Sequence, residues 1–232
     1  MPTPVPSADW HAKSTGAYAR ESNEAFENAI CTYNLLSSLG WTLSAICGVY
    51  GNIEAESGYN PWRWQNDDVL SSRDTSIIAT STAHGYGFPQ FTPAGKYIYS
   101  PYAETNDGYG PNYSNSEGNV FDGDSQLRFI DEHADYAPTG SYPETFSEYK
   151  ASTDSPEHCA RAWLLNYERP YNQSESVQAY RASIARYWYD ILIEYDPSEP
   201  IPPEPTPVLS GESGYSNKFK INFYLKPFYK KL

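Results

Sequence analysis

The sequence predicts a mainly α-helical fold with a smaller part of different character. Apolar residues recur at helical spacing in three segments, 42–57, 155–168 and 174–194. Between residues 58 and 92 this period breaks into short aromatic and Ser/Thr-rich pieces, which are not typical of a helix. These observations predict a bundle of helices with a lobe inserted after the second one.

The elements follow in order along a domain that we expect to span residues 21–195. Residues 1–20 begin with Pro and Ser and predict a flexible N-terminal arm, and the Gly/Asn/Ser/Tyr-rich segment 105–121 predicts a long loop. Between and after them, the apolar pattern predicts helices near 22–39, 42–57, 94–99, 123–135, 143–151, 155–168 and 174–194.

The composition changes after the last of these helices. Residues 196–215 contain six prolines from Pro197 to Pro207 and predict a stiff, extended linker. Residues 216–232 alternate polar and apolar side chains with five Lys and no acid, whereas residues 1–215 carry a net charge of −18. Such a basic strand needs a surface, so we expect it to contact its own domain, a second copy or a virion tail protein; a frayed end is the alternative.

Composition excludes several classes of function. The formal charge of −13 argues against a nucleic-acid partner. No segment is apolar enough to span a membrane, and the first residues lack the blocks of a signal peptide, so we expect neither. The 22 Tyr and 6 Trp supply the apolar faces and polar tips that saccharide clefts use, although most of them must belong to the core.

The cysteines and histidines indicate neither a metal site nor a cofactor site. Cys31 and Cys47 lie among apolar helical neighbours, and with Cys159 they make an odd number, so we expect buried thiols. A Cys–His peptidase is the alternative, with His84, His133 or His158 as base, but no cysteine has the polar helix start that favours a thiolate.

The segment from Gly51 to Pro61 places two carboxylates at the end of an apolar helix. Thr42 is a candidate N-cap for this helix, and Gly58 is a candidate stop. Glu54 and Glu56 therefore lie in the last turn, where the negative end of the helix dipole raises a carboxyl pKa, as a general acid requires. An ideal helical wheel puts Glu54, and not Glu56, on the apolar stripe.

Three motifs in order carry a resemblance to a known family. They are Glu56-Ser-Gly-Tyr-Asn-Pro61, Gly87-Phe-Pro-Gln-Phe-Thr-Pro93 and Tyr167-Glu-Arg-Pro170. With Gly40-Trp41 and Gly51-Asn52 ahead of them, the chain from about Ala25 to Tyr195 resembles the phage tail lysozyme family, within the goose-type lysozyme and lytic transglycosylase superfamily.

The resemblance implies an α+β lysozyme-like fold with a small β-hairpin lobe beside the active-site cleft. It implies an enzyme that cuts the β-1,4 bond between N-acetylmuramic acid and N-acetylglucosamine in peptidoglycan. Glu56 matches the general acid, with Glu54 in reserve, and Ser57, Gln90 and Tyr167 match positions that line the cleft. The protein is then expected in a phage tail or at the bacterial cell wall.

The second catalytic group stays open in the sequence. A hydrolase with two carboxylates would take Asp67, Asp68 or Asp74, whereas a lytic transglycosylase needs Glu56 alone. We interpret Glu168-Arg169 as a structural clamp at a helix end, with Glu168 as second carboxylate the alternative. A glycan-binding module without turnover and a structural tail component remain further alternatives.

Overall fold

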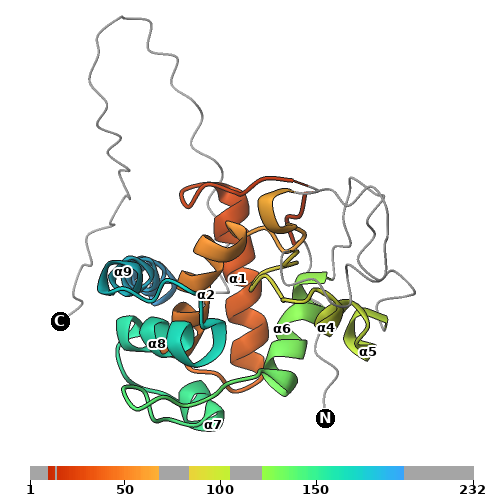
Figure 1. The fold of residues 1–232 in the computed structure, drawn as a ribbon. Helices are drawn as coiled ribbons and strands as arrows, with labels where there is room; N and C mark the ends of the chain where they lie inside the picture. The colour runs from red at the N-terminus through yellow and green to blue at the C-terminus, as the bar shows by residue number, and fades with distance from the viewer. Residues whose placement is uncertain (1–9, 14, 68–83, 105–121, 196–232) are drawn as a thin grey trace, which may run out of the picture. The chain divides into compact units, whose positions relative to one another are not determined.

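The computed structural model describes residues 10–13, 15–67, 84–104 and 122–195, and these residues are mainly helical (Figure 1). Each range predicted to be helical contains a helix. A further short helix, α5, was not predicted. The helices are α1 (Asn23–Ser38), α2 (Leu43–Ser57), α4 (Gly95–Ile98), α5 (Pro101–Glu104), α6 (Asp122–His133), α7 (Phe146–Lys150), α8 (Pro156–Trp163) and α9 (Glu175–Leu192), with a 3₁₀ turn at Gln65–Asp67 and a π-helical turn at Leu164–Glu168.

Helix α2 begins and ends where the sequence predicted. The Thr42 side chain accepts a hydrogen bond from the Ala45 amide, which satisfies one of the unpaired donors of the first turn. Gly58 closes the helix in the left-handed conformation, with φ of 57°. A Cβ atom at Gly58 would also lie 2.1 Å from Ala17 Cβ. Both the left-handed backbone and this close approach therefore require glycine at this position. This stop leaves Glu56 in the final turn.

The core forms around α2, which packs against α1, α8 and α9 (Figure 1). A Cβ atom at Gly51 would lie 2.8 Å from the Ala185 amide nitrogen and 2.9 Å from the Arg181 carbonyl oxygen, so the α9 backbone lies directly against α2. The absence of a side chain at Gly51 therefore lets residues of α9 reach the end of α2.

The described part of the N-terminal segment packs onto the domain, in contrast to the flexible arm expected over residues 1–20. Trp10 is buried, and its indole nitrogen donates to the Asp124 carboxylate at 2.6 Å. The Asn60 side-chain amide donates to the carbonyls of Lys13 and Gly16, at 2.8 and 2.9 Å. Sequence composition missed this packing because one tryptophan and a distant asparagine, and not a periodic pattern, make the contacts.

The described residues between α2 and α4 contain no β-strand. They hold two isolated antiparallel bridges, Trp64–Tyr86 and Tyr86–Phe91. Residues 68–83, the middle of the predicted lobe, lie outside the described residues, as do 105–121 and the linker and tail from 196 to 232. The prediction of a mainly helical fold is confirmed, and the β-hairpin lobe stays a prediction.

The three cysteines are buried and form no disulfide among the described residues, as predicted. Burial raises the pKa of Cys159 to about 12 and that of Cys47 further still, so neither thiol favours the nucleophilic thiolate of a Cys–His peptidase. Within the described ranges no cluster of three metal-ligating side chains occurs, and no helix is long and apolar enough to cross a membrane.

Candidate active site

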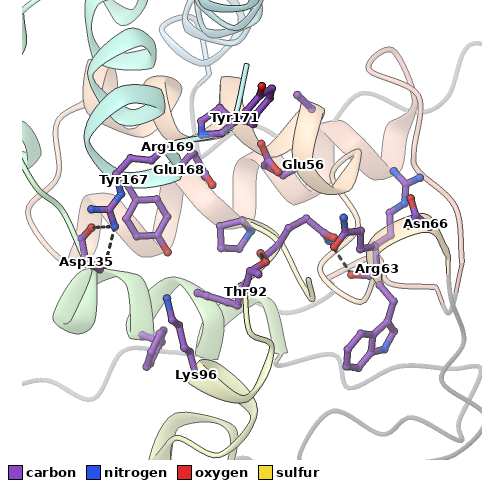
Figure 2. A pocket seen from close by; sticks show the side chains of 18 of the residues that line it. Glu56, Arg63, Asn66, Thr92, Lys96, Asp135, Tyr167, Glu168, Arg169 and Tyr171 are labelled. Carbon is purple, nitrogen blue, oxygen red and sulfur yellow. Dashed lines mark hydrogen bonds and ion pairs between the residues drawn. The ribbon is translucent and has the colours of Figure 1, made fainter. Parts of the chain in front are cut away.

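A pocket lies where the C-terminal end of α2 meets the segment after the π-helical turn (Figure 2). It encloses about 1240 Å³, which exceeds the roughly 300–1,000 Å³ of small-molecule pockets and leaves room for an extended ligand. Its walls come from five separate parts of the chain and consist of Ala55, Glu56, Arg63, Trp64, Gln65, Asn66, Pro89, Gln90, Phe91, Thr92, Lys96, Phe129, His133, Asp135, Tyr167, Glu168, Arg169, Pro170 and Tyr171.

Glu56 lies at the wall of this pocket and has one charged partner. Arg181 of α9 donates through Nη2 to Glu56 Oε1 at 2.6 Å, and through Nη1 to the Asn52 carbonyl at 3.0 Å. The side chain of Arg181 is only 8% exposed, against 20% for that of Glu56. The cation is therefore held inside the protein, while the carboxyl group of Glu56 faces the pocket.

Glu54 lies in the same turn of α2 but outside the pocket. Arg20 donates to both of its carboxylate oxygens at 2.5 Å, Tyr180 donates at 2.9 Å, and the Tyr59 hydroxyl donates as well. Burial alone raises the pKa of Glu54, but these hydrogen bonds outweigh burial and hold it below its usual value. The helical wheel therefore indicated Glu54, but this half-buried side chain forms a structural ion pair.

Glu168 is a second carboxyl group in the pocket, and a π-helical turn places it there. The Arg169 amide donates to the Leu164 carbonyl, five residues back, at 2.8 Å. A turn of this spacing aligns residues five apart, so the Trp163 indole nitrogen reaches Glu168 Oε1 at 2.9 Å. Burial, followed by the negative charge of Glu56, raises the pKa of Glu168 well above its usual value.

The structural clamp expected between Glu168 and Arg169 does not form. Arg169 instead donates to the Asp135 carboxylate at 2.6 Å and to the Asp135 carbonyl at 3.0 Å. Arg169 has a left-handed backbone, with φ of 48°, which ends the turn and directs its side chain away from Glu168. Asp135 could not be predicted as the partner of Arg169, because it follows the end of a distant helix and matches no motif.

Gln90 and Tyr167, which the resemblance assigned to the cleft, both line the pocket. The ring of Tyr167 stacks on Trp163 with centroids 4.2 Å apart, and Figure 2 shows its hydroxyl pointing into the pocket. The Gln90 amide nitrogen donates to the carbonyls of Arg63 and Gly87, at 3.0 and 2.9 Å. Gln90 therefore also holds together the loop that forms this wall.

Ser57 does not reach the pocket, in contrast to the expected role in the cleft. It is fully buried, and its hydroxyl donates to the Ile53 carbonyl at 3.2 Å. One residue beyond Glu56, the helix has turned its side chain into the interior. The motif match could not show this, because matching motifs align residue types and not helix faces.

Asp67, the one candidate aspartate within the described residues, does not line the pocket. Asp67 accepts hydrogen bonds from Arg63 Nε at 2.9 Å and from the Gly16 amide at 2.7 Å, and it does not line the pocket. The Arg63 hydrogen bond is the main reason that the pKa of Asp67 lies below its usual value. Asp68 and Asp74 lie outside the described residues.

Comparison with known proteins places this geometry in a family. A family model described as phage tail lysozyme matches residues 27–192, well over half of the chain. The chain belongs to the phage tail lysozyme family. The match begins in α1 and ends in α9, so it includes every described part of the pocket wall.

A curated relative of this phage tail lysozyme domain is Morphogenesis protein 1 of Bacillus phage B103. It is 35% identical over 170 residues, which are 71% of this chain and 39% of the relative. The chain therefore spans about two fifths of the length of that relative.

Proposed function

We propose that this member of the phage tail lysozyme family is a peptidoglycan-degrading glycosidase. In this proposal it is a muramidase that cleaves the β-1,4 bond between N-acetylmuramic acid and N-acetylglucosamine. The observation that carries the proposal is the open pocket in the family-matched domain, with the Glu56 and Glu168 carboxyl groups on one wall. Most glycoside hydrolases use a pair of carboxyl groups that flank the glycosidic bond in their cleft.

In the proposed reaction, Glu56 transfers a proton to the bridging oxygen while the neighbouring sugar ring develops positive charge. The Glu56 side chain is suited to this task because it is fixed on the last turn of a buried helix and faces the pocket. Tyr167 and Gln90 position the saccharide along the walls.

The aromatic side chains of the pocket support a saccharide ligand. Trp64, Phe91, Phe129 and Tyr167 contribute apolar faces, and Tyr171 lines the pocket with a fully exposed ring. A sugar ring has a face of C–H groups that packs on such rings, and a ring with a polar tip also offers a hydrogen bond to sugar hydroxyls.

The alternative chemistry is that of a lytic transglycosylase, in which Glu56 acts as acid and then as base. This route is favoured by the position of Asp67, which is paired with Arg63 outside the pocket and is not available as a second carboxylate. Mass spectrometry of the products from purified peptidoglycan distinguishes the two: we expect reducing N-acetylmuramic acid ends. Products with 1,6-anhydromuramic ends would establish the transglycosylase route instead.

A second candidate function is a structural role in a phage tail. The name of the relative, a morphogenesis protein, favours this role. In this view the domain belongs to an assembled virion, and the basic segment 216–232 attaches it to a tail protein or to a second copy. Turnover separates the candidates: soluble fragments released from purified peptidoglycan indicate an enzyme, whereas binding without release indicates a glycan-binding or structural component.

A further inference from the structure

The glutamates of the pocket differ in their partners, which suggests that they divide one proton between them. Glu56 receives a charged donor, since Arg181 binds it at 2.6 Å. Glu168 receives a neutral donor, the indole of the fully buried Trp163 at 2.9 Å. Figure 2 shows the two carboxyl groups on the same wall of the pocket, where they point toward one another.

The charges around this pair do not balance if both glutamates are ionised. One buried guanidinium, that of Arg181, faces two carboxyl groups. Of the other cationic side chains that line the pocket, Arg169 is paired with Asp135 at 2.6 Å and Arg63 with Asp67 at 2.9 Å. Lys96 and His133 line the pocket from α4 and α6, and the cation that acts on Glu168 is Arg181. A second negative charge beside the first, with one cation between them, is costly, so the group of three is most stable when one carboxyl carries a proton.

We infer that Glu168 holds the proton that Glu56 delivers to the glycosidic oxygen. This inference rests on the proposed function and adds to it a positioning residue for the proton. Arg181 pairs with Glu56 and leaves the proton to Glu168, whose hydrogen-bond donor is uncharged. The raised pKa of Glu168, caused by burial and then by the charge of Glu56, agrees with this assignment.

The proton returns at the end of each cycle. Glu168 loses it as Glu56 takes it up, and Glu56 passes it to the bridging oxygen, which keeps the electron pair of the broken C1–O bond. The attacking group is water in a hydrolase, or the C6 hydroxyl of the sugar in a transglycosylase. It bonds to C1 and releases one proton, which Glu56 accepts and returns to Glu168.

The test is the pH profile of kcat/KM on purified, solubilised glycan for wild type and Glu168→Gln. The amide oxygen of the new side chain still accepts from Trp163, so the substitution removes the proton and keeps the hydrogen bond. In this variant no second carboxyl group is left to store the proton of the pair. We expect the basic limb of the profile to move to lower pH by about one unit or more, while activity at the acidic end approaches that of wild type.

Glu157→Gln is the matched control. Glu157, like Glu168, accepts a hydrogen bond from a side chain, here that of Arg186 in α9 at 2.6 Å, but it does not line the pocket. We expect its profile to keep the basic limb of wild type. An unshifted Glu168→Gln profile, a uniform loss at every pH, or complete inactivity at every pH would overturn the inference.

A failure of the inference is distinguishable from a failure of the proposed function. If wild type releases no saccharide, the proposed function is wrong. If wild type is active, Glu56→Gln is inactive and Glu168→Gln has the profile of wild type, only the inference is wrong. Should Glu168→Gln fail to fold, ¹³C NMR of wild type with labelled glutamate decides: one carboxyl must remain protonated at neutral pH, and a full set of ionised glutamates contradicts the inference.

Discussion

Glu54 and Glu56 are two residues apart in the last turn of α2, yet their surroundings differ in kind. Glu54 accepts hydrogen bonds from Arg20, Tyr59 and Tyr180, which occupy its oxygens and hold its pKa below the usual value although burial opposes them. Within the described ranges Glu56 has a single charged partner, Arg181, and it faces the pocket. A helix end can thus carry a fully paired carboxylate and a pocket-facing one two residues apart, and the number of partners distinguishes them.

The largest expected effect is the loss of turnover in Glu56→Gln. We expect kcat to fall by at least about 10²-fold, because the substitution removes the proton donor. Adding Glu168→Gln should lower kcat little further, because residues that act as one unit do not contribute independently. Kinetics of both single variants and the double variant measure this, and multiplicative losses would show that the two carboxyls act separately.

The next effect is on stability and comes from Glu54. Glu54→Ala leaves Arg20 and Tyr59 without their carboxylate, and we expect a loss of about 2 kcal/mol, or roughly 4–8 °C in Tm. Calorimetry measures the loss, and kcat well below Tm should stay near that of wild type. A variant that melts normally but is inactive would transfer the catalytic role to Glu54.

The pH dependence of that loss has a definite sign. The folded pKa of Glu54 is lowered, so its stabilisation is present above the unfolded pKa of about 4.3 and disappears as pH falls through the folded value. The difference in Tm between wild type and Glu54→Ala should therefore shrink in acid. A difference that is constant from neutral to acidic pH would mean that packing, and not charge, accounts for the loss.

The contribution of Glu168 to stability should depend on pH in the opposite direction. Its folded pKa is raised, so its contribution is complete below about pH 4.3 and is lost as pH rises through the folded value. The Tm of Glu168→Gln relative to wild type should therefore increase as pH rises from about 4 toward neutral. Thermal melts over this range measure it, and a falling difference would place an ionised glutamate in the pocket.

The smallest expected effect is at the rim of the pocket. Tyr171 lines the pocket with a fully exposed ring, so Tyr171→Ala should raise KM about five-fold, equivalent to about 1 kcal/mol of lost stacking, at unchanged Tm. Tyr99→Ala is the control, since Tyr99 is 49% exposed but lies outside the pocket. Equal effects in the two variants would remove Tyr171 from the binding surface.

Local patterns were sufficient to predict most of the fold. The N-cap Thr42, the stop at Gly58 and the apolar period between them set the bounds of α2 because caps and periodicity act within a few residues. The motifs also indicated Gln90 and Tyr167, and both line one pocket in the structure. They failed at Ser57, where the side a residue faces depends on the helix and not on the motif.

The contacts that separate Glu54 from Glu56 could not be predicted, because they span long stretches of chain. Arg181 lies 125 residues from Glu56, and Arg20 lies 34 residues from Glu54. The π-helical turn that directs Glu168 into the pocket left no trace in the apolar spacing, since Trp163 and Tyr167 fit an α-helix equally well. For the same reason the sequence favoured a clamp between Glu168 and Arg169.

The most direct test of this account compares Glu54→Gln with Glu56→Gln in one assay. Both variants make the same chemical change in the same helical turn, and the initial rate of fragment release from purified peptidoglycan is measured well below both melting temperatures. The account predicts that Glu54→Gln works at least about 10²-fold faster than Glu56→Gln. Loss of activity in Glu54→Gln with near-normal activity in Glu56→Gln would contradict it and move the catalytic carboxyl to the other face of α2.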